Sequence, residues 1–198
     1  MKPFVAACEN NRAPILEVLQ GVFANASAVL EIGSGTGQHA VYFGAHLPHL
    51  TWYTSDLPGH HDGIRQWLDE AALDNVRAPL TLDVTNRPWA VPRVDAVYSA
   101  NTAHIMPWSA VVAMIHGAAG ALEAGGRFVL YGPFNYGGAY TSAGNARFDQ
   151  FLRAHDAAWG IRDFSALDAL ASATGLTLVD DHAMPANNRL LVWNKAGR

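Results

Sequence analysis

Short apolar runs alternate along the chain with longer segments whose apolar residues recur at helical spacing. The short runs predict seven strands, because glycines, prolines or polar residues bound each of them. These strands comprise residues 28–32, 51–54, 80–82, 94–98, 127–131, 176–179 and 190–193. The intervening segments predict helices at residues 14–19, 38–47, 60–73, 111–122, 148–154 and 164–173. Pro14 is expected near a first helical turn, and Gly125-Gly126 is expected to end the helix at 111–122.

The order of these elements predicts an α/β fold. Alternating strands and helices favour a mostly parallel sheet, covered on both faces and joined by right-handed crossovers. The last two strands flank a short loop containing Pro185, which leaves no room for a crossover helix, so they must pair antiparallel. We therefore expect one Rossmann-like, doubly wound domain over residues 1–198, with a seven-stranded sheet and an antiparallel C-terminal hairpin. This arrangement resembles the class I methyltransferase fold more than a dehydrogenase domain.

Composition narrows the class of protein further. Apolar residues make up 50% of the chain and charged residues 15%, against about 25% charged in an average domain, which indicates a globular protein. The low charged fraction is compatible with a surface covered by a second copy, so a homodimer is one expectation. The net charge is −4 and the basic residues are scattered, which argues against a nucleic-acid partner.

Cysteine usage and the absence of long apolar stretches bear on location. Cys8 is the one cysteine, so no internal disulfide forms and a reducing compartment suits the chain. The N-terminal residues carry no signal-peptide pattern, and no stretch approaches the roughly 20 apolar residues of a membrane span. These features predict a cytoplasmic protein without a membrane partner.

The sequence Gly33-Ser34-Gly35-Thr36-Gly37 lies where a predicted strand turns into a helix, so it permits close approach of the backbone to a ligand. A dinucleotide fingerprint would have its third glycine at the position of Gln38, and no phosphate-binding Gly-Lys-Ser/Thr follows. The string from Glu31 to Gly37 instead resembles the first motif of class I methyltransferases. In that family the turn wraps the methionine part of S-adenosylmethionine, and the preceding acid contacts its amino-acid end.

Two acidic residues follow the next strands. Asp56 ends the second strand, where a carboxylate accepts hydrogen bonds from both ribose hydroxyls, and Asp83 ends the third, beside the expected adenine. Either acid alone is equally suited to cap the next helix. Together with the glycine turn they form one crevice at the carboxyl edge of the sheet. The cofactor-binding set predicted on this basis is Glu31, Gly33, Ser34, Gly35, Gly37, Gln38, His39, Asp56, Leu57, Asp83, Val84 and Asn101.

The ends of the fourth and fifth strands are expected to face the transferred methyl group. Asn101 is neutral, whereas His104 is suited to accept a proton near neutral pH, although a core-edge histidine fits the pattern equally well. Tyr131 is the other candidate base, and the two are the predicted catalytic residues. The predicted substrate-binding residues are Glu9, Arg12, Trp108, Asn135, Asn187 and Asn188.

Two other readings of the sequence are disfavoured. His60-His61-Asp62 lacks the ligand spacing of a metal site, so no metal is predicted. Ser34 is not in a Gly-x-Ser-x-Gly elbow, which argues against a hydrolase. Asp149 and Arg153 are spaced i, i+4 and are expected to form at least an ion pair on a helix.

The chain resembles a little-characterised family of small methyltransferase-like proteins, catalogued as a domain of unknown function and present in bacteria and animals, whose animal members are named methyltransferase-like. Matching blocks cover nearly the whole chain; they are residues 6–19, 29–39, 99–108, 131–135, 159–163 and 184–188. The segment Glu9-Asn10-Asn11-Arg12 departs from the Glu-Arg-Asn-Lys expected there. The resemblance implies the fold and the S-adenosylmethionine cofactor, and it implies no particular substrate.

These observations predict an S-adenosylmethionine-dependent methyltransferase acting on the O, N or S atom of a small, partly apolar molecule. A catalytically silent cofactor-binding or interaction protein is the alternative. A nicotinamide-dependent reductase ranks third, because Gln38 and the terminal hairpin both argue against it.

Overall fold

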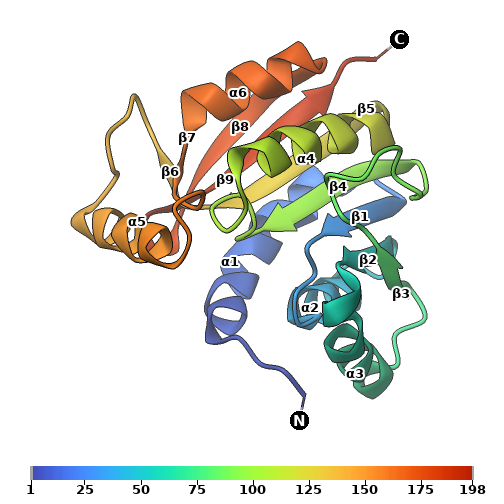
Figure 1. Ribbon diagram of the computed structural model, residues 1–198. Coiled ribbons are helices and arrows are strands. Elements are labelled where there is room, and N and C mark those ends of the chain that lie inside the picture. The colour runs from blue at the N-terminus through green and yellow to red at the C-terminus, as the bar shows by residue number, and fades with distance from the viewer. Residues whose placement is uncertain (1, 198) are drawn as a thin grey trace.

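Seven strands form one sheet at the centre of the computed structural model, which describes residues 2–197 (Figure 1). The strands lie in the order β3-β2-β1-β4-β5-β9-β8. The first five are parallel, whereas β9 is antiparallel to both β5 and β8, which confirms the predicted α/β fold and terminal hairpin. The strand bounds are β1 Ala28–Ile32, β2 Thr51–Asp56, β3 Val76–Thr81, β4 Val94–Ala100, β5 Leu122–Gly132, β8 Leu176–Met184 and β9 Asn188–Lys195.

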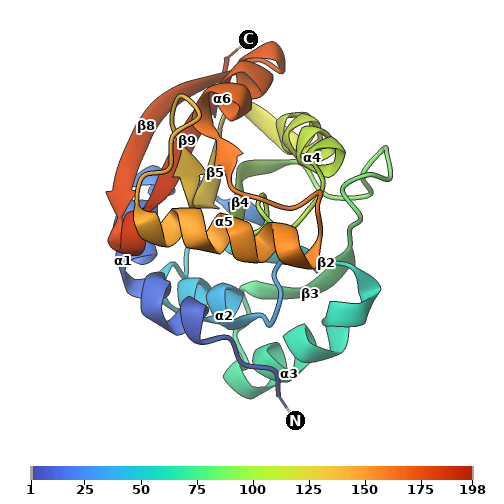
Figure 2. The same ribbon diagram turned by 60° about the vertical axis from the view of Figure 1, so that its left-hand side comes forward.

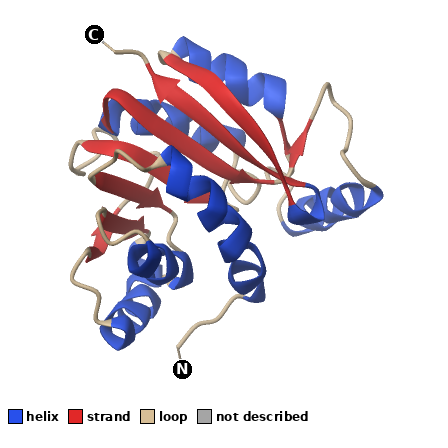
Figure 3. Cartoon of the chain, turned by 180° about the vertical axis from the view of Figure 1, so that it is seen from behind, coloured by secondary structure: helices blue, strands red, loops and turns tan. Residues whose placement is uncertain are grey.

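Helices cover both faces of this sheet, as the alternation predicts. Figure 3, which shows the chain from behind, has α1 lying across one face. Helices α1 and α2 pack on that face, and α4 and α6 pack on the other. The helix bounds are α1 Ala6–Val22, α2 Gln38–His46, α3 His61–Ala71, α4 Trp108–Ala121, α5 Ala143–His155 and α6 Phe164–Ala173, with short 3₁₀ turns η1 Pro58–His60 and η2 Pro185–Asn187.

The two cores follow from the two-residue period of the strands. In β5, Phe128 and Leu130 are buried against α4 and α6, while Val129 and Tyr131 are buried in the core on the α1 and α2 side. Because successive side chains point to opposite faces, a central strand covered on both must be apolar at every position. This is why the parallel strands appear in the sequence as unbroken apolar runs.

Several boundaries differ from the prediction, and three of the differences concern prolines or glycines. Helix α1 begins at Ala6, so Pro14 lies inside it and not in its first turn. Strand β3 begins at Val76 and includes Pro79, which is tolerated because β3 is at the edge of the sheet. Gly125 lies inside β5, at a register shift against β4, and not at a helix end.

Two further features close the carboxyl edge of the parallel strands. Figure 2 shows α5 running across this edge. A second, two-stranded parallel sheet joins β6 (Phe134–Asn135) to β7 (Arg162–Asp163) and so ties the segments on either side of α5. The edge is therefore a roofed crevice, into which the ends of β1, β2, β4 and β5 and the start of β9 bring their side chains.

Candidate active site

The glycine turn between β1 and α2 is held in a conformation that side chains disfavour. Gly33, Gly35 and Gly37 have φ of 72°, 59° and 91°, in the left-handed region. A Cβ on Gly33 would lie 2.6 Å from the Thr102 methyl group, and one on Gly37 would lie 3.2 Å from the Ile64 Cα. Nothing lies within 4 Å of a Cβ built on Gly35. The turn therefore packs tightly on one side and leaves its Gly35 side open.

Glu31, two residues before the turn, is a buried carboxylate with a relative exposure of 2%. Its Oε2 accepts hydrogen bonds from Ser34 Oγ at 2.8 Å and from Trp52 Nε1 at 3.1 Å. Burial raises the pKa of Glu31 to about 7, and these two hydrogen bonds limit the increase. A cationic group brought next to Glu31 would favour its ionised form.

Asp56 and Asp83 lie at the ends of neighbouring strands, as the sequence predicts. Asp56 Oδ2 accepts a 2.7 Å hydrogen bond from Gly35 N, and its Oδ1 accepts one from Leu57 N at 2.7 Å. Asp56 is thus part of the glycine turn itself. Asp83 Oδ1 accepts from Thr85 N at 2.9 Å and from Thr85 Oγ1 at 2.7 Å, and these bonds lower the pKa of Asp83. Each carboxylate keeps acceptor capacity for a ligand, since one carboxylate offers about four lone-pair sites.

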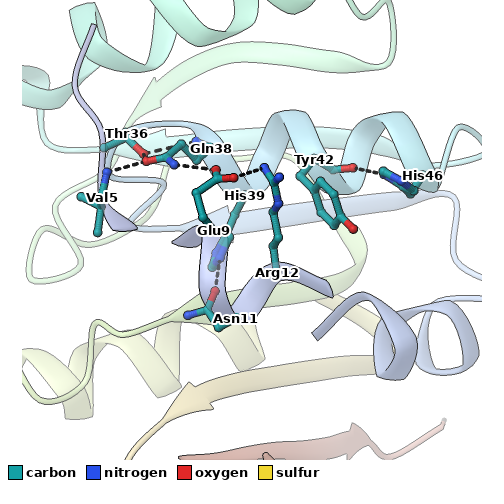
Figure 4. Close-up of polar contacts among 9 residues, drawn as sticks. All are labelled: Val5, Glu9, Asn11, Arg12, Thr36, Gln38, His39, Tyr42 and His46. Atoms are coloured by element: carbon teal, nitrogen blue, oxygen red, sulfur yellow. Dashed lines mark hydrogen bonds and ion pairs between the residues drawn. The ribbon is translucent and has the colours of Figure 1, made fainter. Parts of the chain in front are cut away.

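Gln38 connects the glycine turn to the N-terminal segment (Figure 4). Its Oε1 accepts from Val5 N at 2.7 Å and from Thr36 Oγ1 at 3.0 Å, while its Nε2 donates to Glu9 Oε1 at 2.8 Å. Glu9 in turn pairs with Arg12 at 2.7 Å. Gln38, Glu9 and Arg12 therefore hold the start of α1 against α2 and do not line the cavity described below.

His39 and Asn11 form a second link between the same helices. The His39 Nε2 and the Asn11 Oδ1 are 2.7 Å apart, and the Tyr98 hydroxyl lies 3.4 Å from His39 Nδ1. Burial lowers the pKa of His39 to about 4, so its imidazole is neutral at pH 7. With an exposure of 5%, His39 serves mainly to position Asn11 and Cys8 at the cavity wall.

The segment after β4 carries the candidate base. Asn101 has a φ of 59°, and Thr102 Oγ1 lies 2.7 Å from Ser99 Oγ. His104 is 6% exposed and lies edge-on to Phe148, with ring centroids 5.3 Å apart. Burial, and secondarily the charge of Arg162, lower the pKa of His104 to about 4.

Arg162 of β7 fixes this segment. Its guanidinium donates to the carbonyls of Ala103 at 2.9 Å and Ala158 at 2.9 Å, and also to that of Met106. A planar guanidinium with five donors in a fixed arrangement is well suited to hold several carbonyls at once. Arg162 therefore links the loop that carries His104 to the segment that follows α5.

Tyr131 ends β5 on the side of α1. Burial raises the pKa of its hydroxyl, and hydrogen bonding to the side chains of Asn11 and Asn188 acts against this increase. Asn188 begins β9 and also donates to Pro185 O at 3.1 Å. At neutral pH the Tyr131 hydroxyl keeps its proton and is a hydrogen-bond donor.

A cavity of about 1320 Å³ joins these groups at the carboxyl edge of the sheet. The predicted residues that line it are Glu31, Gly33, Ser34, Gly35, His39, Asp56, Leu57, Asp83, Val84, Asn101, His104, Tyr131 and Asn188. Those that the structure places outside the lining are Gly37, Gln38, Glu9, Arg12, Trp108, Asn135 and Asn187. A pocket for one drug-sized ligand occupies about 300–1,000 Å³, so this cavity has room for a cofactor and an acceptor.

The residues outside the lining have other roles. Trp108 begins α4 and is 39% exposed. Asn187 occupies a turn with φ of 57°, and its carbonyl accepts a 3.2 Å hydrogen bond from Asn145 Nδ2. Asn135 lies in β6, where its Oδ1 is buried without a partner among residues 2–197. The sequence pattern alone does not distinguish these positions from those on the inner surface of the cavity.

Part of the cavity lining comes from residues that the sequence pattern did not indicate. Cys8 and Asn11 come from the first turns of α1, which the pattern did not predict as helical, and Phe148 and Asn145 come from α5. Asp149 and Arg153 form the expected ion pair at 2.8 Å, and neither of them lines the cavity. Phe148 begins the helix predicted at residues 148–154, whereas Asn145 lies before it, in the part of α5 that the spacing did not predict.

Within residues 2–197 no helix is long and apolar enough to cross a membrane. Across the same range no three His, Cys, Asp or Glu side chains are grouped so as to hold a metal ion. His61 bonds instead to the Asp56 carbonyl, at 3.0 Å.

The sheet order, the antiparallel β9 and the crevice at the strand ends define the class I methyltransferase fold. The chain matches, over residues 2–195, the family described as "Protein of unknown function (DUF938)", and it belongs to that family.

Solved structures share this fold at low sequence identity. An O-methyltransferase family protein from Burkholderia thailandensis matches 93% of this chain and 56% of its own, with 20% identity and a TM-score of 0.83. An O-methyltransferase family 2 protein from Planctomyces limnophilus in complex with apigenin matches 96% and 58%, with 14% identity and a TM-score of 0.83. A structure described as PigF with SAH matches 94% and 56%, with 16% identity and a TM-score of 0.81. This chain therefore spans just over half the length of these proteins.

Proposed function

We propose that this protein transfers a methyl group from S-adenosylmethionine to a small-molecule acceptor. The observation that carries the proposal is the coupling of Asp56 to the glycine turn: its carboxylate accepts from Gly35 N at 2.7 Å and lines the same cavity as Glu31 and Asp83. Three carboxylates beside an open glycine backbone suit a ligand that carries an ammonium group, a diol and a purine. The similar folds of known methyltransferases support this assignment.

The proposed cofactor contacts follow the order of the strands. Glu31 is assigned to the amino-acid end, the backbone of Gly33 and Gly35 to the methionine chain, and Asp56 to the ribose hydroxyls. Asp83 and Val84 are assigned to the adenine. The apolar residue Leu57 is 48% exposed and lines the cavity next to Asp56. A bound nucleoside would therefore cover it.

The cofactor supplies an activated methyl group on a sulfonium, and the chain's own residues position the acceptor. Glu31, the glycine turn and Asp56 would hold the cofactor, whose methyl carbon would bond to the acceptor atom while the electron pair of the carbon–sulfur bond remained on sulfur. The acceptor's proton passes to His104 and then to water. Tyr131 holds its own proton, because burial raises its pKa, so it is assigned as a donor to the acceptor and not as the base.

Calorimetric titration with S-adenosylmethionine tests the cofactor assignment. We expect dissociation constants on the order of micromolar, and a loss of at least about a hundredfold in Asp56→Ala. Asp62→Ala is the matched control, because the Asp62 side chain is 95% exposed on α3, pairs with Arg65 of the same helix and lies outside the cavity lining. Absence of binding by a folded wild-type protein would overturn the proposal.

The catalytic assignment has a separate test. His104→Ala is expected to lower the transfer rate about 10²–10⁴-fold while leaving cofactor affinity within about threefold of wild type. The low pKa of His104 makes it a weak base, which keeps a cofactor-binding protein without catalysis as the second candidate function. Cofactor binding without formation of S-adenosylhomocysteine from any acceptor would favour that candidate.

A further inference from the structure

The two ends of the cavity differ in charge. The sheet order places β3, β2 and β1 on one side of β4, and β5 and β9 on the other. The cavity carboxylates Glu31, Asp56 and Asp83 all come from, or directly follow, the first group of strands. The other end of the cavity is built after β4 and β5, from α5 and from the start of β9.

No residue that lines this second end is charged at neutral pH, within the part of the chain that the structure describes. Its polar groups are side-chain amides, the Thr102 and Tyr131 hydroxyls and the neutral imidazole of His104. The remainder of the wall is apolar or aromatic: Ile105, Met106, Pro133, Phe148, Trp159 and Pro185.

Three arginines of the surrounding elements are bonded to other groups, and the fourth, Arg147 of α5, is exposed and lies outside the cavity lining. Arg162 donates to three backbone carbonyls. Arg153 pairs with Asp149 at 2.8 Å, and Arg189 pairs with Asp181 at 2.7 Å. None of these guanidinium groups lines the cavity, so the second end has no cation to receive a carboxylate or phosphate.

The apolar wall is incompletely covered by the protein itself. Ile105 is 45% exposed although it lines the cavity. Phe148 lines the cavity, its ring is T-shaped to that of His104 with centroids 5.3 Å apart, and it stacks on Phe151 with centroids 6.4 Å apart. An aromatic part of the wall therefore lies beside the candidate base. A planar apolar ligand would remove this surface from water, which aromatic side chains favour.

We propose that the acceptor is an uncharged aromatic molecule, bound against Ile105, Phe148 and Trp159 with its reacting hydroxyl or amine directed at His104. That this ligand is a methyl acceptor rests on the proposed function, whereas its chemical class follows from the wall of the cavity alone. Anionic molecules of the same shape are disfavoured, because an anion buried without a partner loses its hydration and gains no ion pair.

Matched ring compounds test the charge preference by calorimetry at pH 7, with and without S-adenosylhomocysteine. The probes are 2-naphthol, 2-naphthoate and 2-naphthyl phosphate, which share one ring system and differ in charge. We expect 2-naphthol to bind at least about tenfold more tightly than either anion.

Two variants locate the site. Phe148→Ala is expected to weaken 2-naphthol binding about tenfold, whereas Gln150→Ala, at an exposed position of the same helix and outside the lining, should change it less than about threefold. Ile105→Lys places a cation on an exposed position of the wall, so the ratio of 2-naphthoate to 2-naphthol affinity should rise about tenfold. This gain in anion binding cannot result from misfolding.

The outcomes separate this inference from the proposed function. Equal or tighter binding of the anions, or no naphthalene binding by protein that binds S-adenosylmethionine, would overturn the inference and leave the cofactor assignment intact. A clear preference for 2-naphthol, lost in Phe148→Ala, would support the inference even if S-adenosylmethionine did not bind.

Discussion

At Gly33, both the backbone conformation and the packing require a residue without a side chain. Its φ is 72°, and a Cβ there would meet the Thr102 methyl group at 2.6 Å. We expect Gly33→Ala to lower the free energy of unfolding by about 2–4 kcal/mol, from backbone strain and overpacking together. Urea denaturation measures the loss.

A second substitution separates the two causes. Thr102→Ser removes the clashing methyl group and keeps the hydroxyl that lies 2.7 Å from Ser99 Oγ, so it should restore about half of the stability lost in Gly33→Ala. Gly35→Ala is the control: its φ is 59° but no atom lies within 4 Å, so it should cost about 1 kcal/mol. Equal losses at both glycines, without rescue, would contradict this account.

Glu31 should make cofactor binding depend on pH. Its pKa of about 7 results mainly from burial, so near pH 6 the carboxyl is mostly protonated. The proposed ammonium partner favours the carboxylate, so binding releases a proton and affinity rises with pH through about 7. Calorimetry in buffers of different ionisation enthalpy measures the released proton. Glu31→Gln should remove the dependence; an identical dependence in that variant would assign it to another group.

At the scale of elements, the N-terminal segment and α2 form one unit through Gln38, which bonds to Val5, Thr36 and Glu9 without lining the cavity. We expect Gln38→Ala to weaken S-adenosylmethionine binding about tenfold, because Cys8 and Asn11 lose their fixed position on the cavity wall. Hydrogen exchange at the Val5 amide provides the structural measurement and should become faster.

Gln20→Ala, at an exposed position of α1, is the control for Gln38→Ala and should alter neither quantity. If Gln38→Ala speeds exchange at Val5 and leaves affinity unchanged, the segment does not help to form the cofactor site.

The elements that sequence reasoning predicted well are those whose burial is decided locally. The strand 28–32 and the helix 164–173 have the observed bounds, because an apolar run between polar breaks has few alternatives. The first turns of α1 were missed, because they depend on contacts with α2 such as the one between Asn11 and His39. Strand β3 begins four residues before its predicted start, since only its edge position makes Pro79 acceptable.

In the candidate site, too, residues placed by the strand ends could be predicted, and residues placed by a local turn could not. Asp56 and Asp83 could be predicted because they end strands, and a parallel sheet brings strand ends together whatever its other contacts. Asn187 and Asn188 are adjacent in sequence, yet only Asn188 lines the cavity. A turn in which Asn187 has a φ of 57° decides between them, and no pattern of residue types reveals it.

At the scale of the whole molecule, three buried ionisable groups determine how stability changes with pH. Burial lowers the pKa of His39 and His104 from 6.5 to about 4, and it raises that of Glu31 from 4.5 to about 7. Between about pH 4.5 and 6.5 the unfolded chain binds two protons on the histidines that the folded chain lacks, whereas the folded chain binds one on Glu31 that the unfolded chain lacks. The net difference is about one proton.

Stability should therefore rise with pH across that window by about 1.4 kcal/mol per pH unit, measured by urea unfolding. His104→Gln should flatten the slope to near zero, because the remaining histidine and Glu31 then cancel. Glu31→Gln should steepen it to about twice the wild-type value, because the opposing group is gone. His116→Gln, at an exposed position of α4, should leave it unchanged. If His104→Gln does not alter the slope, His104 is accessible to protons in the folded state. Its proposed role as a neutral, buried proton acceptor would then have to be abandoned.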